Sequence, residues 1–282
     1  MRSVNYLLSI IFTAVFLCLV SGCSNAAGQD GPRYVITSPE LAELVAILAG
    51  PDPIAGVTIE CDYPPFLKEL PKIGNFGAVD MEKIVNLSPT LVFTSGLEQQ
   101  HITNELAKLN IPVAPFYPQS ISQLDATIAA LGLLLQKEAT ADSLRRFLQE
   151  QLACYSAAIP EYRPRVFVEI YGSPLMSVSD SSFVGELISL AGGRNVFPDL
   201  PREYSRISAE KVVDLDPEII IVTYPGVDAR TVASRKGWEV ISACRNGRIY
   251  TTEDINPDLI LRATPRALEG IKRLRELFHA PA

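Results

Sequence analysis

Two stretches of the chain, 128 residues apart, carry nearly the same sequence. Residues 79–93 read VDMEKIVNLSPTLVF, and residues 207–221 read ISAEKVVDLDPEIII, so that Glu82 lies opposite Glu210. A looser echo of one shared pattern, with one residue fewer in the second copy, starts at Glu43 and again at Glu186. Repeats of this length usually indicate two copies of one structural unit.

Strands alternate with helices around each copy of the repeat. Before the middle of the chain we expect strands over residues 34–36, 57–59, 91–94 and 113–116, and helices over residues 39–48, 81–87 and 102–109. After it we expect strands over 166–170, 219–222 and 249–251, and helices over 183–190 and 209–215. Asp80 and Ser208 are the predicted N-caps of the two repeated helices. This alternation predicts an α/β fold with parallel sheets flanked by helices.

The middle of the chain lacks strand signals. Residues 121–135 and 139–159 place apolar side chains at helical spacing. The second helix would be roughly 30 Å long, at about 1.5 Å per residue. We therefore expect two lobes that are joined by one long helix, with a cleft between them where strand ends gather.

The N-terminus reads as a secretory signal. Arg2 supplies a positive start, residues 6–20 are mostly apolar, and small residues precede Cys23. The apolar run is too short for an ordinary membrane-spanning helix. Small residues followed directly by cysteine look like a bacterial lipobox, in which cleavage precedes Cys23 and its thiol takes the lipid. A plain signal peptide with a chance cysteine and an uncleaved anchor are the alternatives.

These observations divide the chain into five expected segments. They are a lipoprotein signal peptide (1–22), a small, polar tether (23–32), an N-terminal α/β lobe (33–118), connecting helices (119–160) and a C-terminal α/β lobe (161–282). The expected location is extracytoplasmic, with the lipid on Cys23 holding the protein to the membrane.

Composition excludes several functional classes. A chain with a formal net charge of −7 and no basic run is a poor nucleic-acid binder, so we expect no nucleic-acid partner. The only histidines, His101 and His279, are far apart, which argues against a histidine-rich metal site and a Ser–His catalytic pair. No phosphate-binding glycine loop or nucleophile elbow is present. We therefore expect no enzymatic activity, with a tyrosine-ligated haem enzyme as the remaining enzymatic alternative, and we expect no cofactor.

Three cysteines remain once Cys18 in the signal and Cys23 are set aside. An odd number of cysteines outside the cytosol allows at most one internal disulfide among Cys61, Cys154 and Cys244, whose pairing the sequence leaves open. Cys61 could ligate a metal or pack as a small apolar residue, and we favour packing.

The chain resembles the helical-backbone (class III) periplasmic binding proteins of ABC importers, and is most similar to those that bind corrinoids. The resemblance covers about residues 33–280. It is carried by the two glutamate repeats and by the motifs CDYPP (61–65), AGGRNVF (191–197) and RATPR (262–266). It implies a monomer that captures a corrinoid and delivers it to a permease and, through the permease, to its ATPase.

The resemblance assigns the two repeated glutamates to docking. One glutamate at the tip of each lobe, Glu82 and Glu210, would pair with arginines of the permease. The residues alone allow a second interpretation, because an acid in the first turn of a helix is stabilised by the helix dipole by about 0.3–1 kcal/mol.

The resemblance also assigns the cleft walls. Matching motifs place nine residues there: Tyr63, Pro64, Phe76, Ser95, Gly96, Tyr171, Tyr204, Asp258 and Arg262. Flat aromatic faces with a few polar groups suit a large planar ligand. Ordinary packing is the alternative for each tyrosine, and Asp258 and Arg262, four residues apart, could form a structural ion pair instead.

The ligand itself has alternatives. Phe76 and Glu60 stand where the corrinoid-binding pattern has tryptophan and tyrosine. Tyrosine oxygen also suits Fe(III), so a haem or ferric-siderophore binder on the same scaffold stays open. A structural surface lipoprotein without a small-molecule ligand is the second alternative.

Overall fold

The computed structural model describes residues 31–96 and 98–280. The predicted signal peptide and Cys23 lie outside these residues, as does most of the predicted tether. Among the described residues, no helix combines the length and the apolar character that a bilayer crossing needs.

The first parallel sheet follows the sequence prediction closely. Its order is β2-β1-β5-β6, with β1 at Tyr34–Ile36, β2 at Ile54–Val57, β5 at Leu91–Ser95 and β6 at Val113–Phe116. The prediction was wrong in the bounds of β2. This strand starts directly after Pro53 and ends at Val57, and beyond it the Ile59 N–H donates to the Gly74 carbonyl.

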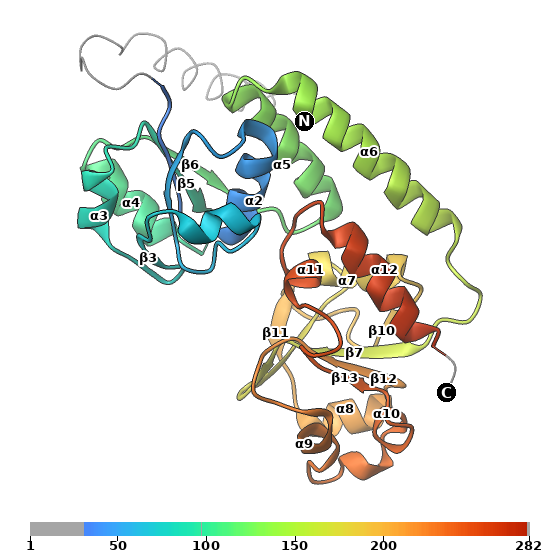
Figure 1. The fold of residues 1–282 in the computed structure, drawn as a ribbon. Helices are drawn as coiled ribbons and strands as arrows, with labels where there is room; N and C mark the ends of the chain where they lie inside the picture. The colour runs from blue at the N-terminus through green and yellow to red at the C-terminus, as the bar shows by residue number, and fades with distance from the viewer. Residues whose placement is uncertain (1–30, 97, 281–282) are drawn as a thin grey trace, which may run out of the picture. The chain divides into compact units, whose positions relative to one another are not determined.

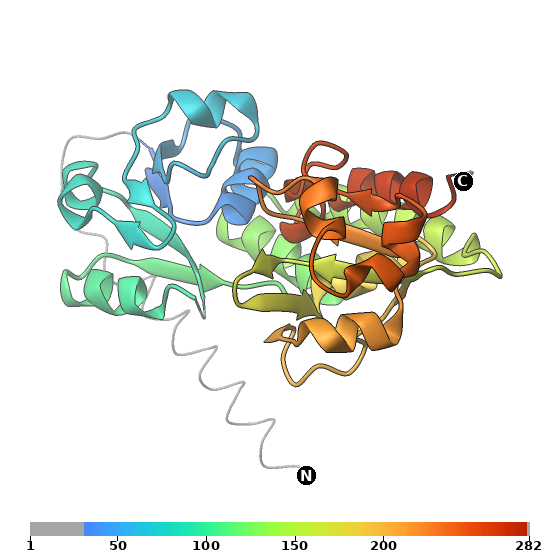
Figure 2. The same cartoon turned by 90° about the horizontal axis from the view of Figure 1, so that it is seen from below.

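The second parallel sheet repeats this order. It runs β10-β7-β12-β13, with β7 at Arg165–Glu169, β10 at Arg194–Asn195, β12 at Ile219–Val222 and β13 at Ile249–Tyr250. Leu91 lies opposite Tyr34 in the first sheet, and its repeat partner Ile219 lies opposite Val166 in the second. The expected α/β fold is therefore confirmed. In Figures 1 and 2 the first sheet is drawn in blue to green and the second in yellow to red, because the colour follows the residue number.

Helices cover both faces of each sheet. In the N-terminal lobe they are α2 (Pro39–Ala49), η1 (Pro65–Glu69), α3 (Met81–Asn86) and α4 (Gln100–Lys108). In the C-terminal lobe they are α7 (Phe183–Leu190), α8 (Ala209–Leu215), α9 (Ala229–Ala233), η2 (Trp238–Val240), α10 (Ser242–Arg245), α11 (Asp258–Leu261) and α12 (Ala267–Phe278).

The repeated sequence forms equivalent helices in the two lobes. The Asp80 carboxylate accepts the Lys83 N–H at 3.1 Å in α3, and the Ser208 hydroxyl accepts the Lys211 N–H at 3.2 Å in α8. Each helix buries one repeated apolar side chain, Ile84 or Val212, against its sheet. Full burial of such a side chain stabilises the fold by about 1.5–3 kcal/mol.

Two helices connect the lobes, α5 (Ile121–Leu134) and α6 (Glu138–Ala157). They pack against each other (Figure 1). One apolar core contains Ile36 of β1, Leu131 of α5, Leu148 of α6 and Val168 of β7. The connection is therefore a packed part of the core that reaches both sheets.

Small antiparallel pairs complete the fold and were not predicted. Strands β8 (Tyr171–Gly172), β9 (Leu175–Val178) and β11 (Tyr204–Arg206) form a sheet in the order β11-β9-β8. A shorter pair joins β3 (Gly74–Asn75) and β4 (Ala78–Val79). Strands of two to four residues carry too few side chains for a recognisable alternation.

Candidate ligand-binding site

Four side chains lie near enough to affect one another's pKa where the strands of the first sheet end. Glu40 follows β1, Glu98 follows β5 and Tyr117 follows β6, while Tyr204 comes from β11 of the other lobe. We call these residues the strand-end cluster. The Tyr117 hydroxyl donates to the Glu98 carboxylate at 3.3 Å. Because the carboxyl ends of parallel strands face one edge, loops from both lobes can converge there.

The strand-end cluster combines acids with neutral phenols. Burial raises the pKa of the Glu40 carboxyl group, and the nearby Glu98 raises it further. Burial and the Glu98 carboxylate raise the pKa of Tyr204 to about 12, and the same two causes raise the pKa of Tyr117. The tyrosines therefore remain protonated at neutral pH, and the cluster presents hydrogen-bond acceptors and phenol donors without a compensating cation of its own.

Gln99 fixes the loop that carries Phe76. The side chain of Gln99 is buried, and its amide group donates to the Phe76 carbonyl at 2.8 Å and to the Thr37 carbonyl at 3.1 Å. The Phe76 N–H donates to the Glu60 carboxylate at 3.0 Å. Glu60, which takes the place expected for a tyrosine, thus orients the phenylalanine loop.

Ser95 and Gly96 lie at the end of β5. Ser95 is fully buried, and its N–H donates to the Gln99 side chain at 2.8 Å. The Gly96 N–H donates to the Phe116 carbonyl at 3.0 Å. Both residues therefore shape the loop after β5, and only Gly96 keeps an accessible surface.

Tyr171 lies at the corresponding edge of the second sheet. It follows β7, is 52% exposed, and its ring centroid lies 6.3 Å from that of Tyr224, which follows β12. We call Tyr171 and Tyr224 the tyrosine pair. The sequence predicted Tyr171 but not Tyr224, although Tyr224 carries the same signal of an aromatic residue directly after a strand.

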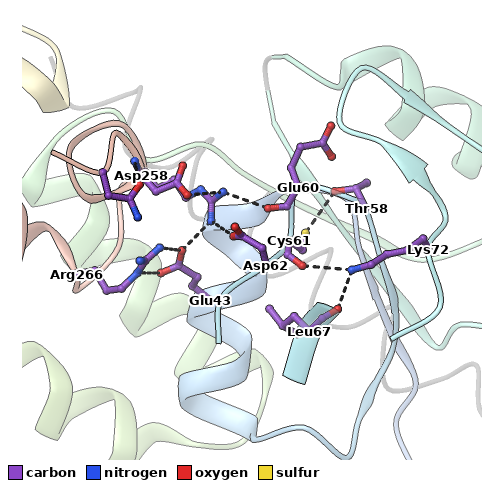
Figure 3. A network of polar contacts seen from close by, with 11 residues as sticks. Glu43, Thr58, Glu60, Cys61, Asp62, Leu67, Lys72, Asp258 and Arg266 are labelled. Carbon is purple, nitrogen blue, oxygen red and sulfur yellow. Dashed lines mark hydrogen bonds and ion pairs between the residues drawn. The ribbon is translucent and has the colours of Figure 1, made fainter. Parts of the chain in front are cut away.

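Arg262 and Arg266 join the lobes through a buried carboxylate. Figure 3 shows Arg266 beside this carboxylate, which belongs to Glu43. Glu43 on α2 is fully buried and accepts from Arg266 at 2.6 and 2.8 Å and from Arg262 at 3.2 Å. Arg262 also pairs with Asp62 at 2.8 Å and with Asp258 at 3.0 Å. We call these five residues the interlobe joint.

The joint changes the interpretation of two predicted cleft residues. Asp258 and Arg262 form the ion pair that their spacing predicted, yet Arg262 also donates to the Glu60 carbonyl at 3.1 Å. Its guanidinium group is only 12% exposed. Both terminal nitrogens of Arg262 are thus engaged by protein partners, and its contacts are those of a structural bridge.

Tyr63 and Pro64 flank the joint. The Arg266 guanidinium lies 3.9 Å from the centroid of the Tyr63 ring, at a distance typical of a cation–π contact. Partial burial raises the pKa of Asp62, but the hydrogen bond from Arg262 outweighs it and holds the pKa below its usual value. Tyr63 keeps 38% of its surface exposed beside this ion cluster.

The three described cysteines are separate thiols, so the described residues contain no disulfide. Cys61 is fully buried beside the Thr58 hydroxyl at 3.3 Å, and burial raises its pKa to about 11. A protonated, buried thiol is a poor metal ligand. Across residues 31–96 and 98–280, no group of three histidine, cysteine or acidic side chains is arranged for a metal ion.

A separate hollow of about 310 Å³ lies among α5, α6, α7 and α12. Its walls are mostly apolar and include Leu124, Leu148 and Phe183. None of the nine predicted cleft residues lines it. Its position beside the connecting helices separates it from the strand ends, where the polar and aromatic groups gather.

Glu82 and Glu210 occupy matching positions in the first turns of α3 and α8. Both side chains are exposed, and neither forms an ion pair with another described residue. Their placement, one in each lobe, agrees with the repeat.

Several residues of the site were missed from the sequence. Glu40, Glu98 and Tyr117 each follow a predicted strand, so a search of the residues that come just after predicted strands would have found them. Glu43 and Arg266 were visible only as members of motifs, because their contact spans 223 residues.

Comparisons with known proteins identify the family of the chain. An uncharacterized ABC transporter substrate-binding lipoprotein of Bacillus subtilis is 27% identical, over 95% of this chain and 87% of its own. A vitamin B12-binding protein of Vibrio parahaemolyticus is 23% identical, over 94% and 96%. A periplasmic haem-binding protein of Roseiflexus has the same fold, with a TM-score of 0.78 at 20% identity over 88% and 98%. A profile described as periplasmic binding protein matches residues 35–255, and the chain therefore belongs to that family.

Proposed function

We propose that the protein is the substrate-binding component of an ABC import system and that it captures a corrinoid, either cobalamin or a precursor. Its relatives include an ABC transporter substrate-binding lipoprotein and a vitamin B12-binding protein. The observation that carries the choice of ligand is the acidic character of the strand-end cluster.

The chemistry of the ligand follows from that cluster. Corrinoids carry neutral carboxamide side chains, whose N–H groups donate hydrogen bonds. Glu40 and Glu98 offer carboxyl oxygens as acceptors for such donors, and an acceptor that is ionised forms hydrogen bonds about twice as strong as a neutral one. Haem propionates and anionic siderophores would instead meet like charge. The tyrosine pair and Tyr204 supply aromatic faces for a planar ring.

Haem is the second candidate, because a haem-binding protein shares the fold. Tyrosine ligation of Fe(III) requires loss of the phenol proton, and the pKa of Tyr204 is raised to about 12. Fe(III) would therefore have to displace this proton on binding to Tyr204. An anionic ferric siderophore would in addition be placed beside the acidic side chains of the strand-end cluster.

Calorimetry with the described chain tests the proposal. Cyanocobalamin should bind saturably and raise the unfolding temperature, whereas haem should bind at least tenfold more weakly. The visible spectrum of protein purified from its native host provides an independent check, because corrinoid, haem and ferric siderophore absorb differently. The absence of both heat and a thermal shift at high excess of cyanocobalamin would refute the corrinoid. No saturable binding of any of the three would favour a structural lipoprotein.

Delivery to the permease is assigned to Glu82 and Glu210. Replacing both with alanine should abolish uptake in cells while leaving the calorimetric Kd for cyanocobalamin unchanged, because both side chains are exposed on α3 and α8 and neither belongs to the strand-end cluster. Lys83→Ala with Lys211→Ala is the matched control, since these side chains are the exposed neighbours in the same repeat. Normal uptake by the double glutamate variant would contradict docking through these residues.

The location follows from the same proposal. Cleavage before Cys23 and lipidation of its thiol would leave a monomer anchored outside the cytoplasm, with residues 24–32 as a tether. The permease would act with its own ATPase, and no enzymatic role is assigned to this chain.

A further inference from the structure

The tyrosine pair stands on two neighbouring strands of the second sheet. Glu169 ends β7 and lies opposite Val222, which ends β12. Tyr171 and Tyr224 each come two residues later, and their rings are inclined at 53° with centroids 6.3 Å apart. Tyr171 exposes about half of its surface, and Tyr224 lies deeper.

A buried ion pair holds the lower ring. Glu169 is fully buried, and Arg235 donates to its two oxygens at 2.5 and 2.7 Å. The Tyr224 hydroxyl donates to the same carboxylate. Both oxygens of Glu169 are therefore satisfied, and a satisfied buried network is rigid because each lost partner would leave an uncompensated polar group.

The packing around this network leaves little room for movement. A Cβ atom on Gly172 would collide with the hydroxyl group of Tyr224 and lie 3.0 Å from its Cζ. On the other side, the Arg235 guanidinium lies 4.6 Å from the centroid of the Trp238 ring. Trp238 is the only tryptophan in the chain and is fully buried.

We propose that Glu169 is a positioning residue that, through Arg235 and Tyr224, fixes the tyrosine pair as a rigid wall against which the ligand packs. This inference rests on the proposed function for the use of the wall, but the fixing of the pair is a property of the ligand-free protein. Aromatic walls bind best when their rings are already held in the bound orientation, because less side-chain entropy is lost on binding.

The same network determines what Tyr224 can do. Burial and the hydrogen bond to Glu169 raise its pKa to about 12, although Arg235 acts in the opposite direction. Because the Tyr224 hydroxyl group is engaged by the Glu169 carboxylate, Tyr224 offers its ring rather than its oxygen. A wall of this kind suits a ligand that is recognised by its flat face.

Two variants disturb the network in different ways. Glu169→Gln removes the charge at constant shape and leaves Arg235 without its partner. Gly172→Ala keeps every charge but displaces the Tyr224 ring. We expect each to weaken cyanocobalamin binding by about tenfold in calorimetry, the scale of one well-oriented aromatic contact. Asp125→Asn is the matched control, because it removes a two-bond arginine pair on α5, with Arg145 at 2.8 and 3.1 Å, and should leave the Kd unchanged.

Spectra of the ligand-free proteins separate positioning from general destabilisation. In Glu169→Gln the near-UV circular dichroism of tyrosine should decrease and Trp238 emission should shift, while Asp125→Asn changes neither. Unchanged spectra in Glu169→Gln would overturn the proposal, and so would changed spectra with an unchanged Kd. If the wild type binds no cyanocobalamin, haem or ferric siderophore, the proposed function fails, and the spectra alone decide whether Glu169 holds the pair.

Discussion

Glu40 shows how a single residue can link binding and stability. Its pKa is raised by burial and by Glu98, with Arg262 acting in the opposite direction. A carboxyl group whose pKa is higher in the folded state opposes folding once the pH exceeds its unfolded-state value, near 4.5. The penalty grows until the pH passes the folded-state pKa and is constant above it. Glu40 therefore lowers the free energy of unfolding near neutral pH, as expected for a side chain that serves binding rather than folding.

Glu40→Gln tests this cost. We expect the variant to unfold at a higher temperature than the wild type at about pH 7.5, and at the same temperature at about pH 4, where both side chains are neutral. Thermal unfolding followed by circular dichroism across this range measures the difference. Glu150→Gln, an exposed change on α6, is the control. A gain that is equal at both pH values would show that ionisation of Glu40 is not the cause.

Residue chemistry explains why some of the site could be predicted and some could not. Tyr171 follows β7, a strand that the sequence makes recognisable, whereas Phe76 follows β3, which the sequence did not predict, and was placed by the family resemblance alone. Arg262 was predicted as a ligand contact, but its partners Glu43 and Asp62 lie more than 190 residues away. Local patterns carry no information on such a contact.

At the scale of elements, the matched helices α3 and α8 allow a comparison within one chain. We expect Asp80→Ala and Ser208→Ala each to lower the free energy of unfolding by about 1 kcal/mol, the usual loss for an N-cap. Urea denaturation measures both. The exchanges Asp80→Ser and Ser208→Asp should cost much less, because each keeps a capping oxygen. A full loss in the exchanges would mean that the side chains act by other contacts.

Element prediction succeeded where several buried apolar residues occur in sequence. Strand β12 (IIIV) and helix α7 were predicted with their observed bounds, because their patterns are long enough to be unambiguous. Strands β8 and β9 form by pairing with each other and with β11, and this pairing depends on the chain reversal at Ser173 and Pro174. Their short sequences contain no comparable signal.

For the whole molecule, the interlobe joint and the continuous core oppose large movements of the lobes. The core passes from β1 through α5 and α6 to β7, and the joint binds α2 to the α11–α12 segment. We therefore expect small adjustments on ligand binding, with release driven by the permease through both lobes.

Glu43→Ala removes the centre of the joint. Arg266 would lose both of its hydrogen bonds to a carboxylate, so we expect the free energy of unfolding to fall by about 3–5 kcal/mol in urea denaturation. The double variant Glu43→Leu with Arg266→Met should recover most of this loss, because no charge is then left unpaired. A double variant as unstable as the single one would show that packing, rather than charge, explains the loss.

The joint also has a consequence for the order in which the chain is made. Glu43 leaves the ribosome 223 residues before Arg266, a delay of roughly 10–45 s at about 5–20 residues per second. During that time its carboxylate stays hydrated, and the cavity it later occupies cannot close without leaving a buried charge unpaired. Completion of the packing around Glu43 thus requires the segment that carries Arg262 and Arg266, and a chain truncated before that segment would leave the carboxylate unpaired.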